Sequence, residues 1–200
     1  MSRDNALFAL AGVLVGFVVA YFLYEAIGEK QPPRLPAAEA AAAGPMGAAP
    51  PGGPGGGAAD PAALRREAER IEAFLGESPD VPQAWLQLGN LRFDAREYPA
   101  AAEAYRRYLA LAPPDPDVLT DLGVAYHLMQ RPDDALEQFA AAQRLAPDHW
   151  QSRFNEVVVL AFDLGRYDEA SRVLDELREL QPGNPDVERL AAEVERRRGA

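Results

Sequence analysis

Apolar residues recur three and four positions apart in six consecutive segments between residues 82 and 180, which is the spacing of one face of an α-helix. We expect helices over residues 82–95, 98–111, 116–129, 132–145, 151–164 and 167–180. Pro99, Pro113, Pro132, Gly165 and Pro182-Gly183 separate these segments, and such residues start or end helices. Taken in pairs, the segments form three helical hairpins. Each hairpin alone would expose an apolar face, so its stability requires stacking on a neighbour.

The three hairpins repeat one short pattern. Its alanines stand at 101, 135 and 170 and its prolines at 113, 147 and 182, so both markers recur after 34 and then 35 residues. Around them lie Trp85-x2-Leu88-Gly89, Leu119-x2-Leu122-Gly123-x2-Tyr126, Ala101-x3-Tyr105 and Ala135-x3-Phe139. This pattern resembles the tetratricopeptide repeat (TPR), which has a period of about 34 residues. The resemblance implies an all-α superhelix that serves as a binding scaffold.

The third repeat departs from the pattern. Val157-Val158 replaces the Leu-Gly pair, Ala161 replaces the tyrosine, and we place one extra residue in Asp148-His149-Trp150. Because the small residue that lets two helices approach is missing, we expect a different packing angle between its helices. Repeat one departs less, with Arg92 in place of the usual tyrosine.

Two further helices flank the repeats. Asp60-Pro61 is a helix start, with an acidic cap before a proline at the first helical position. Stepping back 34 residues from Tyr105 and Pro113 gives Ile71 and Pro79, so this segment is interpreted as a capping half-repeat. The stretch from Asn184 to Arg198 is expected to be a closing helix that buries Val187, Leu190, Ala191 and Val194. Its three final arginines, 196–198, are interpreted as complementing the negative end of the helix dipole, and a binding patch is the alternative.

The chain before the repeats has a different composition. Residues from Asn5 to Tyr24 carry no charge, and about twenty residues at roughly 1.5 Å rise per residue cross a bilayer core of ~30 Å. We therefore expect a transmembrane anchor over residues 1–30. A cleaved signal peptide is the alternative, although its apolar region is usually about 7–15 residues long. Residues 31–60 are rich in Ala, Pro and Gly, too poor in large apolar side chains to fold, and form the expected disordered linker.

Small residues line one side of the expected anchor. Gly12, Gly16 and Ala20 are four apart and would form a dimerisation face between two membrane helices, although such residues are also common in membrane spans generally. The count of cations sets Arg3 and the amino terminus against Lys30 and Arg34, which leaves the orientation undecided.

These boundaries divide the chain into seven parts. They are an anchor (1–30), a linker (31–60), a capping half-repeat (61–81), three TPRs (82–115, 116–150 and 151–184) and a C-terminal capping helix (185–200).

Composition excludes several function classes. The net charge of −11 argues against nucleic-acid binding, which needs clustered cations. The absence of cysteine excludes disulfides, thiol catalysis and zinc ribbons. His127 and His149 lack a metal-ligand spacing, and no phosphate-binding Gly-Lys motif occurs. We therefore expect no enzymatic activity, no metal and no cofactor.

The resemblance to TPR proteins implies that the first helix of each hairpin lines a concave groove for a peptide. Carried over by register, the peptide-binding residues are Gln87, Asn90, Phe93, Asp94, Asp117, Asp121, Val124, His127, Asn155, Glu156, Val159, Phe162 and Asp163. Five of them are carboxylates and none is lysine or arginine, so the expected partner is a basic, partly apolar segment. The carboxylate clamp of some TPR co-chaperones is matched only at Asn90; Leu86, Asp121, Ser152 and Glu156 occupy its other positions, which disfavours a carboxylate ligand.

Anchor, linker and repeats together are similar to the TPR subunits of bacterial cytochrome c biogenesis. That resemblance implies an assembly factor or chaperone in the inner (cytoplasmic) membrane, with its repeats in the periplasm. The alternative is a structural scaffold of an envelope complex that acts through membrane-helix dimerisation and the convex face.

Overall fold

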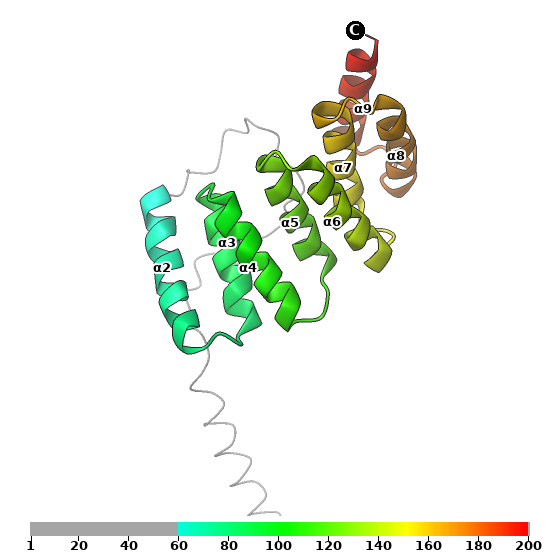
Figure 1. Ribbon diagram of the computed structural model, residues 1–200. Coiled ribbons are helices and arrows are strands. Elements are labelled where there is room, and N and C mark those ends of the chain that lie inside the picture. The colour runs from blue at the N-terminus through cyan, green and yellow to red at the C-terminus, as the bar shows by residue number, and fades with distance from the viewer. Residues whose placement is uncertain (1–59, 200) are drawn as a thin grey trace, which may run out of the picture. The chain divides into compact units, whose positions relative to one another are not determined.

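The computed structural model describes residues 60–199, which form eight α-helices and one π-helical turn joined by short loops (Figure 1). The elements are α2 (Pro61–Glu77), α3 (Pro82–Asp94), α4 (Tyr98–Leu111), α5 (Pro116–Leu128), α6 (Pro132–Leu145), α7 (Trp150–Val158), η1 (Val159–Asp163), α8 (Tyr167–Leu180) and α9 (Pro185–Arg198). With η1 counted as the end of the α7 segment, the six hairpin helices begin and end within one residue of their expected positions, and the all-α expectation is confirmed for this part of the chain. The division into repeats stays a prediction. The expected anchor and nearly all of the linker lie outside the described residues.

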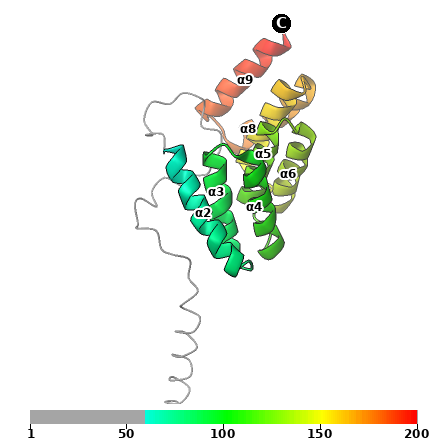
Figure 2. The same cartoon turned by 60° about the vertical axis from the view of Figure 1, so that its left-hand side comes forward.

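Each helix packs on the helices next to it in sequence. Figure 1 shows α2 to α6 one after another, and Figure 2 shows the same helices from another side. The core consists of three apolar clusters in series. One joins α2, α3 and α4, a second centres on α4, α5 and α6, and a third joins α7, η1, α8 and α9. Leu136 and Leu164 pack against both the second and the third cluster. The stack is therefore continuous, as the apolar faces of isolated hairpins require.

Side chains and prolines fix the helix starts. The Asp60 carboxylate accepts a hydrogen bond from the Ala62 N–H at 3.0 Å, and the Asn184 side chain accepts one from the Asp186 N–H at 2.9 Å. Each of these caps precedes a proline at the first position of its helix, as expected. The turn inside each hairpin holds one residue in the left-handed conformation: Arg96 (φ 61°), Gln130 (φ 59°) and Gly165 (φ 64°).

Glycine lets the two helices of each of the first two hairpins approach closely. A Cβ added to Gly89 would lie 2.5 Å from a ring carbon of Tyr105, and one added to Gly123 would clash in the same way with Phe139. Both rings are fully buried. In the third hairpin the constant 34-residue spacing places Val157 at the glycine position, so the expected match of Val157-Val158 to the Leu-Gly pair is wrong by one residue. Val157 and Leu174 share one core cluster, with Leu174 in the place of the two aromatic residues. A smaller residue on α8 thus accompanies the loss of glycine on α7.

The extra residue of the third repeat lies inside its first helix. Helices α3, α5 and α7 begin at residues 82, 116 and 150, a constant spacing, whereas α8 begins 35 residues after α6. The additional residue forms the turn η1, where the Leu164 N–H donates to the Val159 carbonyl five residues back at 3.2 Å. The expectation that Asp148-His149-Trp150 holds it is wrong, because a π turn absorbs one residue without lengthening the loop. The expected change in packing angle stays a prediction.

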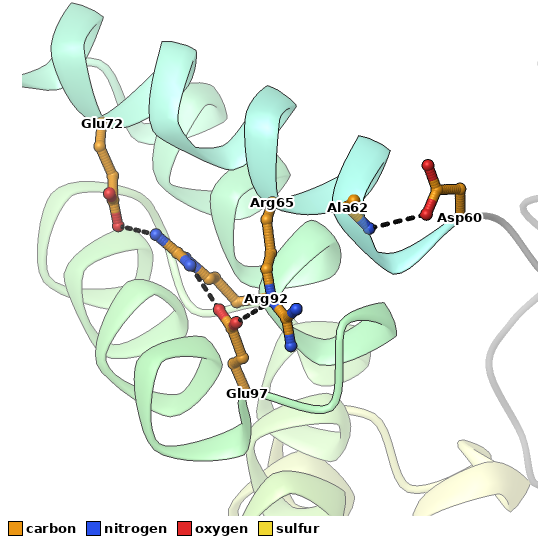
Figure 3. A network of polar contacts seen from close by, with 6 residues as sticks. All are labelled: Asp60, Ala62, Arg65, Glu72, Arg92 and Glu97. Carbon is orange, nitrogen blue, oxygen red and sulfur yellow. Dashed lines mark hydrogen bonds and ion pairs between the residues drawn. The ribbon is translucent and has the colours of Figure 1, made fainter.

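The helix α2 packs on α3 as α4 packs on α5, and Ile71 is buried with Leu88, as expected for a half-repeat. Arg92 on α3 pairs with Glu72 on α2 at 2.7 Å and also with Glu97 (Figure 3). Arg65 on α2 bonds the same Glu97 at 2.7 Å. The hydrogen bond from Arg65, and then that from Arg92, lowers the pKa of the Glu97 carboxyl below its usual value. Arg92, unusual for the family, therefore ties α2 to the first hairpin.

The C-terminal helix α9 buries Val187, Leu190, Ala191 and Val194, which confirms the expected closing helix. No helix within residues 60–199 is both long and apolar enough to cross a membrane.

Substituting Gly123 tests the close approach inside a hairpin. We expect Gly123→Ala to lower the free energy of unfolding by about 1–3 kcal/mol, because the methyl group collides with the buried Phe139 ring. Adding Phe139→Leu should recover part of this loss, since it recreates the pairing of the third hairpin. Gly76→Ala is the control: nothing lies within 4 Å of its added Cβ, so urea unfolding should show no loss. Equal losses in both variants would contradict this packing.

The ion pair between Arg92 and Glu72 predicts that substitutions at these two positions have coupled effects on stability. Counted back by 34 residues, Arg106 on α4 and Tyr126 on α5 correspond to Glu72 on α2 and Arg92 on α3. Arg92→Tyr should cost about 1–2 kcal/mol, because it leaves Glu72 without its cation. The double variant Arg92→Tyr with Glu72→Arg should unfold at a higher urea concentration than Arg92→Tyr alone. Arg70→Tyr, on the exposed side of α2, is the control; additive effects of the two substitutions would refute the coupling.

Candidate functional site

The expected peptide-binding residues lie on α3, α5, α7 and η1, and we call the surface that they share the first-helix face. Eleven of the thirteen are exposed or half-buried: Gln87, Asn90, Phe93, Asp94, Asp117, Asp121, Val124, His127, Glu156, Phe162 and Asp163. These side chains are accessible to a partner. Gly12, Gly16 and Ala20 lie outside the described residues.

The other two expected residues are buried, and their assignment to an accessible surface is wrong. Val159 is 1% exposed within the core cluster of Phe139, and Asn155 is 8% exposed and donates its side-chain N–H to the Gln151 carbonyl at 2.9 Å. The error at Val159 arises because a shift of 35 residues was applied to the whole helix, whereas α7 is displaced by 34 up to the π turn. At that spacing Asn155 takes the place of Asp121, and its side chain bonds the Gln151 carbonyl. Glu156 takes the place of the core residue Leu122 and accepts a hydrogen bond from Gln143 on α6. Val158, half-buried and 34 residues after Val124, takes the expected place of Val159.

Two carboxylates of the first-helix face have no cation beside them. Within residues 60–199, neither Asp94 on α3 nor Asp121 on α5 makes an ion pair. Burial raises the pKa of Asp121 to about 7, and repulsion from Asp117, Asp115 and Asp94 adds to it. Burial also raises the pKa of Asp94. This end of the face therefore holds negative charge that the surrounding protein does not neutralise.

Tyr105 links these carboxylates to the core. Its hydroxyl donates to the Asn90 side-chain oxygen at 3.0 Å, which fixes the orientation of that amide. Burial raises the pKa of Tyr105, and the charges of Asp121 and Asp94 raise it further. The residue that fills the space opposite Gly89 thus also positions Asn90 on the first-helix face.

Histidines pair with two other carboxylates of the face. The Nδ1 atom of His127 on α5 lies 2.5 Å from the Oδ2 atom of Asp163 on η1. His149 has a side chain that is only 10% exposed, although the residue lies in a loop, and its Nε2 lies 2.9 Å from Asp117. Its Nδ1 accepts the Ser152 N–H and caps α7, so Nε2 carries the proton donated to Asp117. These contacts join neighbouring hairpins and make the face continuous from α5 to η1.

The last helix also reaches this surface. The Arg197 guanidinium lies 4.7 Å from the centre of the Phe162 ring, and Arg198 pairs with Asp168 at 2.8 Å. The sequence favours the dipole of α9 over a binding patch for these arginines, and the contact with Phe162 adds a role on this surface. The spacing of 35 residues between Phe162 and Arg197 is the signal in the sequence that could have placed them here. Among the described residues, no three acidic or histidine side chains gather as a metal site would need.

Comparison with known proteins identifies the repeats. The family model described as tetratricopeptide repeat matches residues 64–116, 120–185 and 158–200. The chain belongs to the tetratricopeptide repeat family. Among solved TPR structures, MamA superposes with a TM-score of 0.63 at 16% identity, covering 69% of this chain and 75% of MamA. YrrB, described as a TPR protein with an unusual peptide-binding site, gives 0.57 at 22% identity and 66% and 68% coverage.

Two further relatives extend the comparison. The first TPR of Spaghetti (RPAP3), bound to the HSP90 peptide SRMEEVD, gives a TM-score of 0.55 at 18% identity, covering 60% of this chain and 94% of that domain. A curated relative, "Cellulose synthase 2 operon protein C" of Komagataeibacter xylinus, is 27% identical over 150 residues, 67% of this chain. The chain spans only 11% of that protein's length, so the likeness concerns the repeats.

The uncompensated Asp121 predicts an unusual dependence of stability on pH. Its folded pKa, about 7, lies above the ordinary 3.8, so between these values the folded state holds a proton that the unfolded state releases. Stability should fall as the pH rises through this window, by at most about 4 kcal/mol. Asp121→Asn should remove this decline, and the exposed Glu179→Gln should retain it. Urea unfolding across the pH range measures the effect; parallel curves for Asp121→Asn and wild type would exclude it.

Proposed function

We propose that this TPR protein is a membrane-tethered scaffold that binds a basic, partly apolar polypeptide segment along the first-helix face. The observation that carries the proposal is the uncompensated negative charge of Asp94 and Asp121 beside accessible apolar side chains. A cation from a partner would supply the neutralising charge that this chain does not place there. Binding would then restore the ionised form of Asp121.

The apolar contribution would come from the same two helices. Phe93 is half-buried and packs edge-on against Tyr98 with ring centres 5.4 Å apart, so its ring is held in a fixed orientation. Val124 is half-buried on α5, and Leu128 is 39% exposed at the end of that helix. An apolar side chain of the partner could cover these groups, while the charges would set partner choice and association rate.

The peptide-bound relatives support a polypeptide ligand and suggest how this one differs. The HSP90 peptide on Spaghetti and the HSP70 peptide SGPTIEEVD on the second TPR domain of human RPAP3 both end in Glu-Glu-Val-Asp. Such an acidic end would be repelled by Asp94 and Asp121. We therefore assign the opposite charge preference to this chain.

The membrane tether rests on the uncharged stretch from Asn5 to Tyr24. Repeats that are tethered near the inner membrane through the Ala-, Pro- and Gly-rich linker would suit an assembly factor or chaperone in the periplasm, as in cytochrome c biogenesis. Crosslinking in the native membrane, followed by mass spectrometry, would identify the partner. A reporter fused at Ala200 tests the orientation: activity of a cytoplasmic reporter there would refute the periplasmic placement.

The charge preference can be tested with two labelled peptides of equal length, in which leucine alternates with arginine or with glutamate. We expect the arginine peptide to bind and the glutamate peptide not to bind. Asp94→Lys, at an exposed position, and Asp121→Lys should each weaken binding about tenfold or more, equal to about 1.4 kcal/mol. Glu179→Lys on α8 makes the same change of charge on the second helix of its hairpin and should have little effect. Equal losses in all variants would show a non-specific charge effect and reject the proposed site.

Binding of the arginine peptide should also depend on pH. Because a nearby cation favours ionised Asp121, its binding should release a proton, and affinity should increase between about pH 6 and pH 8. Isothermal titration calorimetry in buffers of different ionisation enthalpy measures that proton. Asp121→Asn should show no such release; an unchanged release would assign the proton to another group.

A further inference from the structure

The C-terminal helix α9 occupies the place of a fourth first helix. The helices α3, α5, α7 and α9 begin at residues 82, 116, 150 and 185, which continues the spacing of the repeats. Their preceding residues include the caps Asp115, His149 and Asn184, each of which accepts a hydrogen bond from the first turn of its helix. The first-helix face can therefore be followed onto α9 by register.

Two rows of side chains cross all four helices near their C-terminal ends. The first row contains Phe93, His127, Phe162 and Arg197, and the second contains Asp94, Leu128, Asp163 and Arg198. Contacts confirm that neighbouring members are adjacent: His127 meets Asp163 at 2.5 Å, and Arg197 lies over the Phe162 ring. These contacts join α5 to η1 and η1 to α9, and the repulsion between Asp94 and Asp121 relates α3 to α5.

The charge of the first-helix face reverses from one end to the other. Asp94 of the second row and Asp121, seven residues before Leu128 on α5, have no cation beside them, and Asp163 is paired with His127. Arg197 and Arg198 lie at the α9 end with side chains 52% and 48% exposed. Arg197 also bonds Glu193 at 2.9 Å, and Arg198 pairs with Asp168 and more weakly with Glu195. Exposed pairs of this kind contribute little stability, so a carboxylate of a partner can share or replace them.

We propose that the first-helix face binds a segment of segregated charge, with its cations over α3 and α5 and a carboxylate at Arg197 and Arg198. This inference rests on the proposed function and adds the direction in which the segment lies. Four helices about 10 Å apart span roughly 30 Å, which an extended chain of about nine or ten residues covers. The carboxylate is either an acidic side chain or the free carboxyl terminus of the partner.

A set of peptides of equal length tests the segregation, with the full-length protein in detergent micelles. One peptide carries arginines in its first half and glutamates in its second half, another interleaves the same residues, and a third replaces the glutamates by glutamine. We expect the segregated peptide to bind about fivefold more tightly than the interleaved one. Equal affinities of these two peptides would overturn the inference.

The arginines are tested by the double variant Arg197→Glu with Arg198→Glu. It should abolish the advantage of the segregated peptide and bind the arginine-glutamine peptide more tightly than wild type does. Arg189→Glu, on an exposed part of the same helix, is the control and should keep the advantage. If circular dichroism shows that the double variant unfolds, Arg197→Gln with Arg198→Gln replaces it. Persistence of the advantage in the folded double variant would also overturn the inference.

Two outcomes separate this inference from the function on which it rests. If the arginine-glutamine peptide binds but segregation gives no gain, the inference fails alone. If no arginine peptide binds, both fail. Segregated peptides with a free or an amidated carboxyl terminus, and with glutamate or glutamine near that end, identify the source of the carboxylate.

Discussion

The close approach of two helices within each hairpin is the contact on which the rest of the structure depends. Gly89 and Gly123 remove the side chain at the point where Tyr105 and Phe139 cross, and the rings fill the space. In the third hairpin Leu174 replaces the ring, and valine replaces glycine. Because the interior of each hairpin is filled by these pairs, the opposite sides of α3 and α5 remain accessible. The first-helix face is a consequence of that packing.

The carboxylates of this face that have no cation beside them lower the stability of the folded protein. Asp121 is half-buried close to other carboxylates, and its raised pKa reports that burial and repulsion oppose its ionised form. Two other carboxylates of the face are paired, Asp117 with His149 and Asp163 with His127. A carboxylate with a raised pKa and no cation beside it is typical of a functional site.

Much of the fold was predictable because its signals are local. Prolines and caps such as Asp60 and Asn184 define helix starts within a few residues, and the apolar spacing on α9 identified its buried side. The position of the extra residue in the third repeat could not be predicted in this way. The sequence restricts it to the stretch between Pro147 and Ala170, but whether a loop or a helix absorbs it depends on how the helix fits its neighbours. That single displacement explains the wrong assignment of Val159.

The site was predictable in part for the same reason. Register placed eleven residues at accessible positions, including Asp94 and Asp121, because the repeat carries them. His149 and Arg197 were missed because their roles come from contacts between repeats, with Asp117 and Phe162, that no local pattern contains. Arg92 likewise takes its role from Glu72 on the preceding helix.

The measurement that tests the central claim most directly is a titration of the isotope-labelled protein with the arginine-leucine peptide, followed by amide chemical shifts. The account predicts that the largest changes lie on α3 and α5, around Asp94 and Asp121, with α4, α6 and α8 nearly unchanged. Chemical-shift changes concentrated on those second helices, with almost none on the first-helix face, would contradict it.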